Sequence, residues 1–212
     1  MYTIIVQNIT PLEDTYMIVK KMKVNNSQCL IAYFSRSGNN YVNGKIVNLP
    51  VGNTEVVAKM IQEMAGGDLF PIETVKAYPG DYMETTEVAK QELRTNTRPK
   101  LTRHRESMAS YEVIFLGYPN WWGTMPMPVF TFLEEYDFSG KTIAPFCTNE
   151  GSGLGRSVAD IKKLCPHSTV LDGLAIRGGE VKTAQNELSG WLRDTGMLTR
   201  NSLSESLEKN SL

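Results

Sequence analysis

From residue 29 onward, short apolar runs alternate with amphipathic segments along the chain. A run such as CLIAYF, bounded by turn residues, is typical of a strand buried on both faces. This pattern predicts five strands, at 29–34, 68–73, 111–118, 141–148 and 169–176. Apolar residues at helical spacing predict five helices, at 54–65, 83–93, 127–136, 156–165 and 181–196. The alternation indicates an α/β fold in which helices cover both faces of a parallel sheet.

The chain divides into three parts on this pattern. Residues 1–28 form an N-terminal extension, residues 29–198 one α/β domain, and residues 199–212 a Ser-rich polar tail. A length of 212 residues with 41% hydrophobic content is enough for one sizeable core. Pro71 cannot donate a ladder hydrogen bond, so we expect the second strand to lie at an edge of the sheet.

Composition excludes several classes of protein. Lys and Arg number 22 against 23 Asp and Glu, and this near balance argues against nucleic-acid partners and strongly acidic docking proteins. The 3 Cys include no C-x-x-C pair, which indicates a reducing compartment, and 2 His make a His-rich metal site improbable. Neither a long apolar span nor a signal-peptide pattern is present, so we predict a cytoplasmic protein without membrane contact.

Ligands of open parallel sheets bind beyond the carboxyl ends of the strands. The first such loop, SRSGNN, leads on to the helix at 54–65, and hydroxyl and amide donors here can hold a phosphate without a Lys. The candidate groups are Ser35, Ser37, Asn53 and Thr54, with Gly38 and Gly52 allowing close backbone approach. The alternative is an ordinary polar turn with Asn53 or Thr54 as the helix N-cap.

Two further loops follow the third and fourth strands. In PNWWG, either Trp121 or Trp122 can stack on a planar ligand, and we expect one of the two to close the sheet against a helix. Gly123 would let the backbone turn beneath a ligand ring. In TNEGSGLG, polar and backbone groups can bond the edge of a heterocycle, although a plain strand-to-helix turn is the alternative.

Other phosphate sites do not match. GNNYVNGK has one residue too many between its glycines for a Walker A loop, and Ile46 replaces the required Ser or Thr. GSGLG is not a dinucleotide fingerprint, and the gap from Cys147 to Arg156 is too long for a small phosphatase loop. A phospho-receiver would need acidic residues where the first and third strands end, and this chain has none there.

The three loops in this order resemble the flavodoxin-like FMN-binding family. YFSRSGNN with VGNTEVVAKMI resembles the family's phosphate loop and first helix, and the likeness covers about residues 29–196. It implies a three-layer sandwich with a parallel sheet of order 2-1-3-4-5 and non-covalently bound FMN. The FMN phosphate would contact Ser35, Ser37, Gly52, Asn53 and Thr54. The flavin ring would be lined by Pro119, Asn120, Trp121, Trp122 and Gly123. The pyrimidine edge and ribityl chain would contact Thr148, Asn149, Glu150, Gly151, Ser152 and Gly153.

The chain departs from the family at NYVNGKIVNLPV, residues 40–51, which separates the two halves of the phosphate loop. Its NGK and LPVG segments contain residues that favour turns. We predict that the insertion folds as a short flap, a β-hairpin about Asn43-Gly44, beside the phosphate or the ring. Restricting access or binding a partner subunit are its candidate roles.

Three functions remain open on the sequence. The first is an FMN oxidoreductase that reduces a small acceptor such as a quinone with NAD(P)H. The second is a one-electron carrier that docks on redox proteins, against which the net charge of -1 argues, and the third is a non-catalytic flavin-dependent interaction protein. No covalent catalyst or metal is expected, and a homodimer is left open. Tyr78, Tyr82 and Glu150 are candidate substrate contacts, and Cys147 is expected to be a buried, inert thiol.

Overall fold

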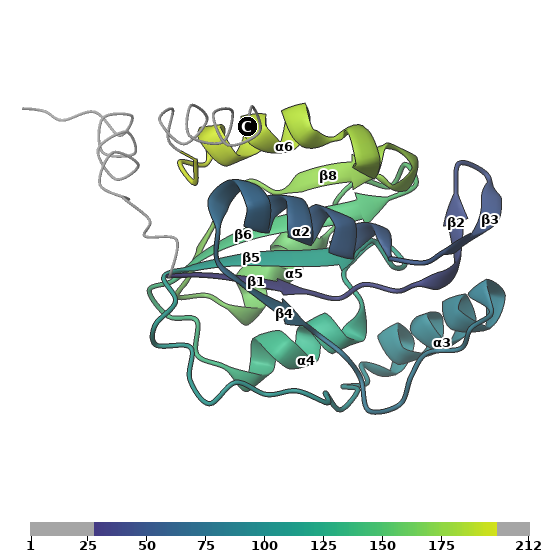
Figure 1. Cartoon of the computed structure of the whole chain (residues 1–212). Coiled ribbons are helices and arrows are strands. Elements are labelled where there is room, and N and C mark those ends of the chain that lie inside the picture. Colours follow the sequence, from purple (N-terminus) through teal and green to yellow (C-terminus); the bar gives the residue numbers. More distant parts are fainter. Residues whose placement is uncertain (1–27, 199–212) are drawn as a thin grey trace, which may run out of the picture.

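The apolar runs of the sequence form the central sheet in the computed structural model, which describes residues 28–198 (Figure 1). Its strands are β1 (Cys29–Tyr33), β4 (Asp68–Pro71), β5 (Val113–Pro119), β6 (Thr142–Asn149), β7 (Thr169–Val170) and β8 (Leu174–Arg177). Their pairings are parallel, in the order β4-β1-β5-β6-β7, and β8 also pairs with β6. The predicted strand order 2-1-3-4-5 is confirmed.

The predicted end segments fall almost wholly beyond this range. The extension at 1–28 lies outside the described residues apart from Gln28, and the tail at 199–212 lies outside them entirely. Among the helices of residues 28–198, none has both the length and the apolar character needed to cross a membrane.

Prolines set two features of the sheet. Within residues 28–198, β4 ends at Pro71 and pairs with β1 alone, so the predicted edge position is confirmed for this part of the chain. The single strand expected at 169–176 is instead divided into β7 and β8, which pair with the two ends of β6. The interruption lies opposite Pro145, which has no N–H to donate to the neighbouring strand. Within the interruption, the Asp172 carbonyl accepts from the Trp191 indole N–H.

Helices cover both faces of the sheet, as predicted (Figure 1). Their bounds are α2 (Asn53–Ala65), α3 (Tyr82–Thr95), α4 (Met127–Glu135), α5 (Ser157–Leu164) and α6 (Gln185–Asp194). The last differs from the expected helix at 181–196, because a 3₁₀ helix, η2 (Gly178–Thr183), precedes it.

Alternate residues of each strand feed two separate cores. Ile31 and Phe115 pack with α2 and α6 on one face, and Leu30 and Ile114 pack with α4 and α5 on the other. All four side chains are fully buried. The continuous apolar runs therefore reflect strands covered on both sides, which fixes where their carboxyl ends, and the loops after them, come together.

The insertion forms the predicted hairpin, which projects beyond the carboxyl edge of the sheet (Figure 1). Its strands are β2 (Gly38–Val42) and β3 (Lys45–Leu49), paired antiparallel. Asn43 and Gly44 make the turn with φ of 49° and 83°, the two positive angles of a type I′ turn. The hairpin begins at Gly38, two residues before the predicted insertion.

Candidate functional site

The helix that follows the hairpin begins without a side-chain cap of its own. Gly52 is the N-cap residue of α2 and makes no side-chain hydrogen bond. The Ser35 hydroxyl accepts from the backbone N–H of Glu55 at 3.1 Å, so the cap is Ser35 rather than Asn53 or Thr54. The N–H groups of Asn53 and Thr54 precede the first intrahelical bonds and carry positive character. This helix end is suited to an anion.

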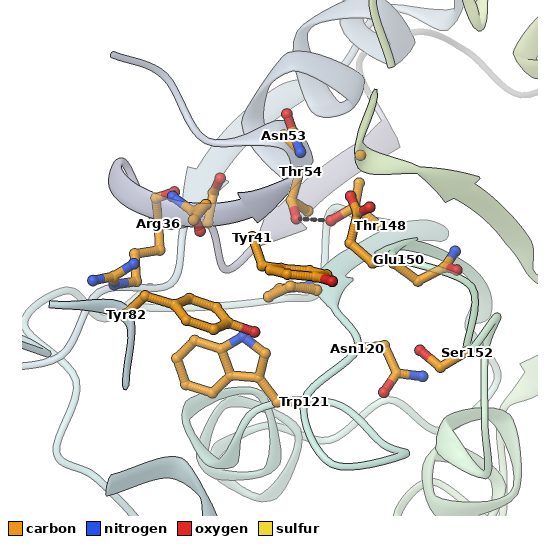
Figure 2. Close-up of a pocket in the computed structure, with 15 residues that line it drawn as sticks. Arg36, Tyr41, Asn53, Thr54, Tyr82, Asn120, Trp121, Thr148, Glu150 and Ser152 are labelled. Carbon is orange, nitrogen blue, oxygen red and sulfur yellow. Dashed lines mark hydrogen bonds between the residues drawn. The ribbon is translucent and has the colours of Figure 1, made fainter. Parts of the chain in front are cut away.

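A cavity of about 280 Å³ opens at the carboxyl ends of β1, β5 and β6 (Figure 2). Most of the residues predicted from the sequence to contact FMN line this cavity: Ser35, Asn53, Thr54, Pro119, Asn120, Trp121, Thr148, Asn149, Glu150 and Ser152. The remaining predicted residues lie outside its lining: Ser37, Gly52, Trp122, Gly123, Gly151 and Gly153. Side chains from all three predicted loops therefore converge on one space.

A buried hydroxyl pair joins the first loop region to the third. The Oγ1 atoms of Thr54 and Thr148 are 2.8 Å apart, and both side chains are buried. Figure 2 shows this bond at the wall of the cavity. It fixes the start of α2 against the end of β6. The helix end suited to an anion and the cavity wall formed by the third loop are therefore held together.

Trp121 and Trp122 have different surroundings. Trp121 lines the cavity and packs edge-on against Phe34 and Tyr78, with ring centroids 5.2 and 5.0 Å away. Trp122 is 47% exposed, and its Nε1 donates to the Thr86 carbonyl of α3 at 3.0 Å. One Trp thus packs on the domain and the other reaches to a helix beside the cavity.

The second loop is held in a tight turn. Trp122 and Gly123 have φ of 53° and 82°, and the flanking residues bond each other's backbone, as in a type I′ turn. Asn120 accepts from the Gly123 N–H at 2.9 Å and donates to the Gly153 carbonyl at 2.8 Å. Asn120 therefore ties the second loop to the third.

The third loop uses its own backbone groups internally. The Asn149 Oδ1 accepts from the N–H groups of Gly151 and Gly153, at 2.8 and 3.0 Å. Its Nδ2 donates to the Ile176 carbonyl at 3.2 Å. These two glycine amides are therefore paired within the loop, and the groups that line the cavity there belong to Asn149, Glu150 and Ser152.

The hairpin crosses from the first loop to the third. At its tip the Asn43 N–H donates to the Glu150 Oε2 at 2.9 Å. Along its first strand Tyr41 stacks on Tyr82 of α3, with centroids 6.0 Å apart and planes 24° from parallel. Tyr41 and Tyr82 both line the cavity (Figure 2). The insertion therefore forms part of the site wall.

Arg36 connects the hairpin base to the segment before α3. Its guanidinium donates to the carbonyls of Asn39, Pro79, Gly80 and Asp81. Burial lowers the pKa of Arg36, with Asp81 opposing that shift. Because its Nη1 and Nη2 atoms donate to these carbonyls, Arg36 acts mainly to position the cavity wall.

Sequence reasoning missed Arg36, Asn40, Tyr41 and Gly178 as lining residues. Arg36 lies in the SRSG segment after the first strand, and Gly178 follows the last strand. Ligands of parallel sheets bind beyond the carboxyl ends of the strands, so the positions of both residues indicate this site. A Cβ at Gly178 would lie 2.4 Å from the Glu150 Oε1 and 2.5 Å from the Asn53 Nδ2. Only glycine leaves these two polar groups in place.

Cys147 matches its expectation of a buried thiol. It is 1% exposed, and burial raises its pKa to about 12, so the unreactive protonated form dominates at neutral pH. Tyr78, a candidate substrate contact on the sequence, donates to the Glu92 Oε2 at 2.6 Å and packs with Trp121. Its side chain therefore takes part in packing within the domain. Within the described residues there is no group of His, Cys, Asp and Glu suited to a metal ion.

A family model described as Flavodoxin matches residues 28–195. Among curated proteins, Flavodoxin 1 of Escherichia coli (strain K12) is 28% identical over 109 residues, which are 50% of this chain and 48% of that protein. The chain therefore matches about half the length of this curated relative.

Two solved structures extend the comparison over the whole domain. A candidate flavoprotein of Bacteroides eggerthii is 29% identical with a TM-score of 0.65, covering 80% of this chain and 98% of that one. A flavoprotein of Lactobacillus acidophilus in complex with FMN has a TM-score of 0.53 at 20% identity, covering 74% of this chain and 97% of that one. The second likeness concerns the fold alone.

Proposed function

Because this chain belongs to the flavodoxin family, we propose that it is an FMN-dependent oxidoreductase that reduces a small acceptor, such as a quinone, with electrons from NAD(P)H. Family membership supports FMN as the cofactor. The reaction moves a hydride from NAD(P)H and one proton from solvent onto the quinone, which leaves as the hydroquinone. We place this activity in the cytoplasm.

The groups around the cavity fit FMN. Its phosphate suits the start of α2, where the N–H groups of Asn53 and Thr54, the Ser35 hydroxyl and the Asn53 side-chain amide gather. The space left by the missing Cβ of Gly178 keeps Asn53 and Glu150 at the wall. Aromatic side chains of Tyr41, Tyr82 and Trp121 line the other end and suit a planar ring (Figure 2).

FMN supplies transfer of one or two electrons, and the chain sets the conditions for it. Ser35, Asn53 and Thr54 would hold the phosphate. Asn149, Glu150 and Ser152 would meet the polar edge of the ring, while Trp121 and the hairpin exclude water from it. The Glu150 carboxylate there disfavours added negative charge beside it.

The position of the hairpin is the observation that favours an enzyme over a carrier. A carrier must present its flavin edge to a protein partner. Here the hairpin spans the cavity from its base at Arg36 to its tip at Asn43, which bonds Glu150 at 2.9 Å. A covered ring is reached more readily by a small molecule than by a docking protein. A net charge of -1 also gives little of the long-range electrostatic attraction by which a strongly acidic carrier draws in its protein partner.

Stepwise reduction of the FMN-loaded protein separates these functions. We expect the flavin absorbance to bleach without build-up of a long-wavelength, one-electron-reduced form, and NAD(P)H to be consumed when a naphthoquinone is added. Accumulation of that form, with no NAD(P)H consumption, would support a carrier and contradict the proposal. Bound FMN that shows neither behaviour would support a non-catalytic interaction protein.

Gly178→Ala should weaken FMN binding about tenfold. Its new Cβ displaces the Asn53 amide and the Glu150 carboxylate, and one lost hydrogen bond to a charged group costs about 1.5 kcal/mol. Titration of FMN-free protein measures the change. Gly190→Ala is the matched control, because a Cβ there meets nothing within 4 Å. Equal FMN affinity in both variants would show that this wall does not contact FMN.

A further inference from the structure

A second cavity of about 380 Å³ lies beside the first, between α3 and the loop at 119–122. Its lining combines apolar and aromatic side chains with a few polar ones: Arg36, Asn40, Tyr82, Met83, Thr85, Thr86, Ala89, Asn120, Trp121 and Trp122. None of these is acidic. Its size and character are those of a pocket for a small organic molecule.

The two cavities share a wall. Arg36, Asn40, Tyr82, Asn120 and Trp121 line both of them. The two cavities therefore adjoin, and a molecule in the second would lie next to FMN in the first. This adjacency gives the second cavity a direct relation to the proposed redox site.

The aromatic wall of the second cavity is held in place from several sides. Trp122 keeps a left-handed backbone, with φ of 53°, which a non-glycine residue rarely adopts. Its indole N–H donates to the Thr86 carbonyl at 3.0 Å, and the Lys90 Nζ lies 5.1 Å from the ring centroid. The ring nevertheless stays 47% exposed. A large apolar ring fixed at the mouth of a cavity indicates a surface for a planar partner.

The charges around the cavity favour a neutral ligand. The Nη1 and Nη2 atoms of Arg36 donate to backbone carbonyls of its own chain. Lys90 is engaged with the Trp122 ring. Neither is placed to bind the pyrophosphate of a dinucleotide. The Asn40 amide already donates to the Arg36 and Gly38 carbonyls. The Asn120 amide spends one N–H on the Gly153 carbonyl and keeps the other for the carbonyl oxygen of a ligand.

We propose that this second cavity, called the acceptor cavity, binds the ring system of an uncharged aromatic acceptor of the quinone class, stacked against Trp122. The inference rests on the proposed oxidoreductase function and names where its acceptor binds. The remaining N–H of the Asn120 amide, at the shared wall, bonds the quinone oxygen nearest the FMN cavity.

The test uses oxidised, FMN-loaded protein without reductant, so that binding is measured without turnover. The probe is 2-methyl-1,4-naphthoquinone, titrated by calorimetry. Thr86→Phe fills the cavity from a half-exposed position, and we expect quinone affinity to fall about tenfold while FMN stays bound. Val88→Phe adds the same ring on α3 at an exposed residue outside the cavity, and its quinone affinity should match the wild type.

A second variant guards against misfolding of the first. Trp122→Ala removes the stacking ring, and we expect a similar loss of about tenfold, with retained flavin absorbance reporting a folded site. Wild-type quinone affinity in both variants would overturn the inference. A wild-type protein that binds FMN but no quinone refutes the acceptor cavity, whereas one that binds no FMN refutes the proposed function itself.

Discussion

Replacing Asn53 and Thr54 together by alanine is expected to weaken FMN binding by about 100-fold or more. Each hydrogen bond to a charged phosphate contributes about 1.5–3 kcal/mol, and the variant removes one side-chain donor at each position. Both residues line the cavity at the start of α2, where the backbone amides lack intrahelical partners. Titration of FMN into flavin-free protein measures the change.

Thr54→Ser is the matched control for this experiment. It keeps the hydroxyl that bonds the Thr148 hydroxyl at 2.8 Å, so the contact between α2 and β6 is retained. We expect its FMN affinity to stay within about threefold of the wild type. A double variant that binds FMN as tightly as this control would show that the phosphate is held elsewhere.

Phe115→Ala should destabilise the domain by about 3–5 kcal/mol, the usual cost of a cavity left by a buried aromatic ring. Phe115 is fully buried in β5 and contacts Trp191 of α6, with centroids 6.0 Å apart. The loss is a large part of the 5–15 kcal/mol that holds most domains folded. Denaturant unfolding of FMN-free protein is the measurement, since bound FMN would add stability of its own.

Val75→Ala serves as the comparison for Phe115→Ala. Val75 is 66% exposed, so its truncation should change the free energy of unfolding by less than about 0.5 kcal/mol. A similar stability for Phe115→Ala and Val75→Ala would mean that β5 does not carry the core described here.

The sheet was predictable because its signals are local. Continuous apolar runs indicate strands buried on both faces, and Pro71 alone indicates an edge. The division of the last strand was not predictable in this way. It lies opposite Pro145 of a neighbouring strand and beside the Trp191 indole of a later helix, neither of which the local sequence pattern brings together with it.

The site shows the same division between local and distant causes. Loops at strand ends, such as the one that carries Trp121, follow from the topology of a parallel sheet. The stack of Tyr41 on Tyr82 joins segments that no sequence pattern connects. The pairing of the Gly151 amide with Asn149 is likewise a matter of loop geometry. Residue types in a motif indicate which groups gather, and the fold decides which of them stay free for a ligand.

The proposed function requires the start of α2 to bind the phosphate of FMN. Its most direct test compares the binding of FMN and of riboflavin, which lacks the phosphate, to the flavin-free protein. We predict that one FMN binds per chain, that its visible absorbance follows the protein through gel filtration, and that riboflavin binds at least about 100-fold more weakly. Equal affinities for the two flavins, or a protein that stays colourless with FMN, would contradict the account.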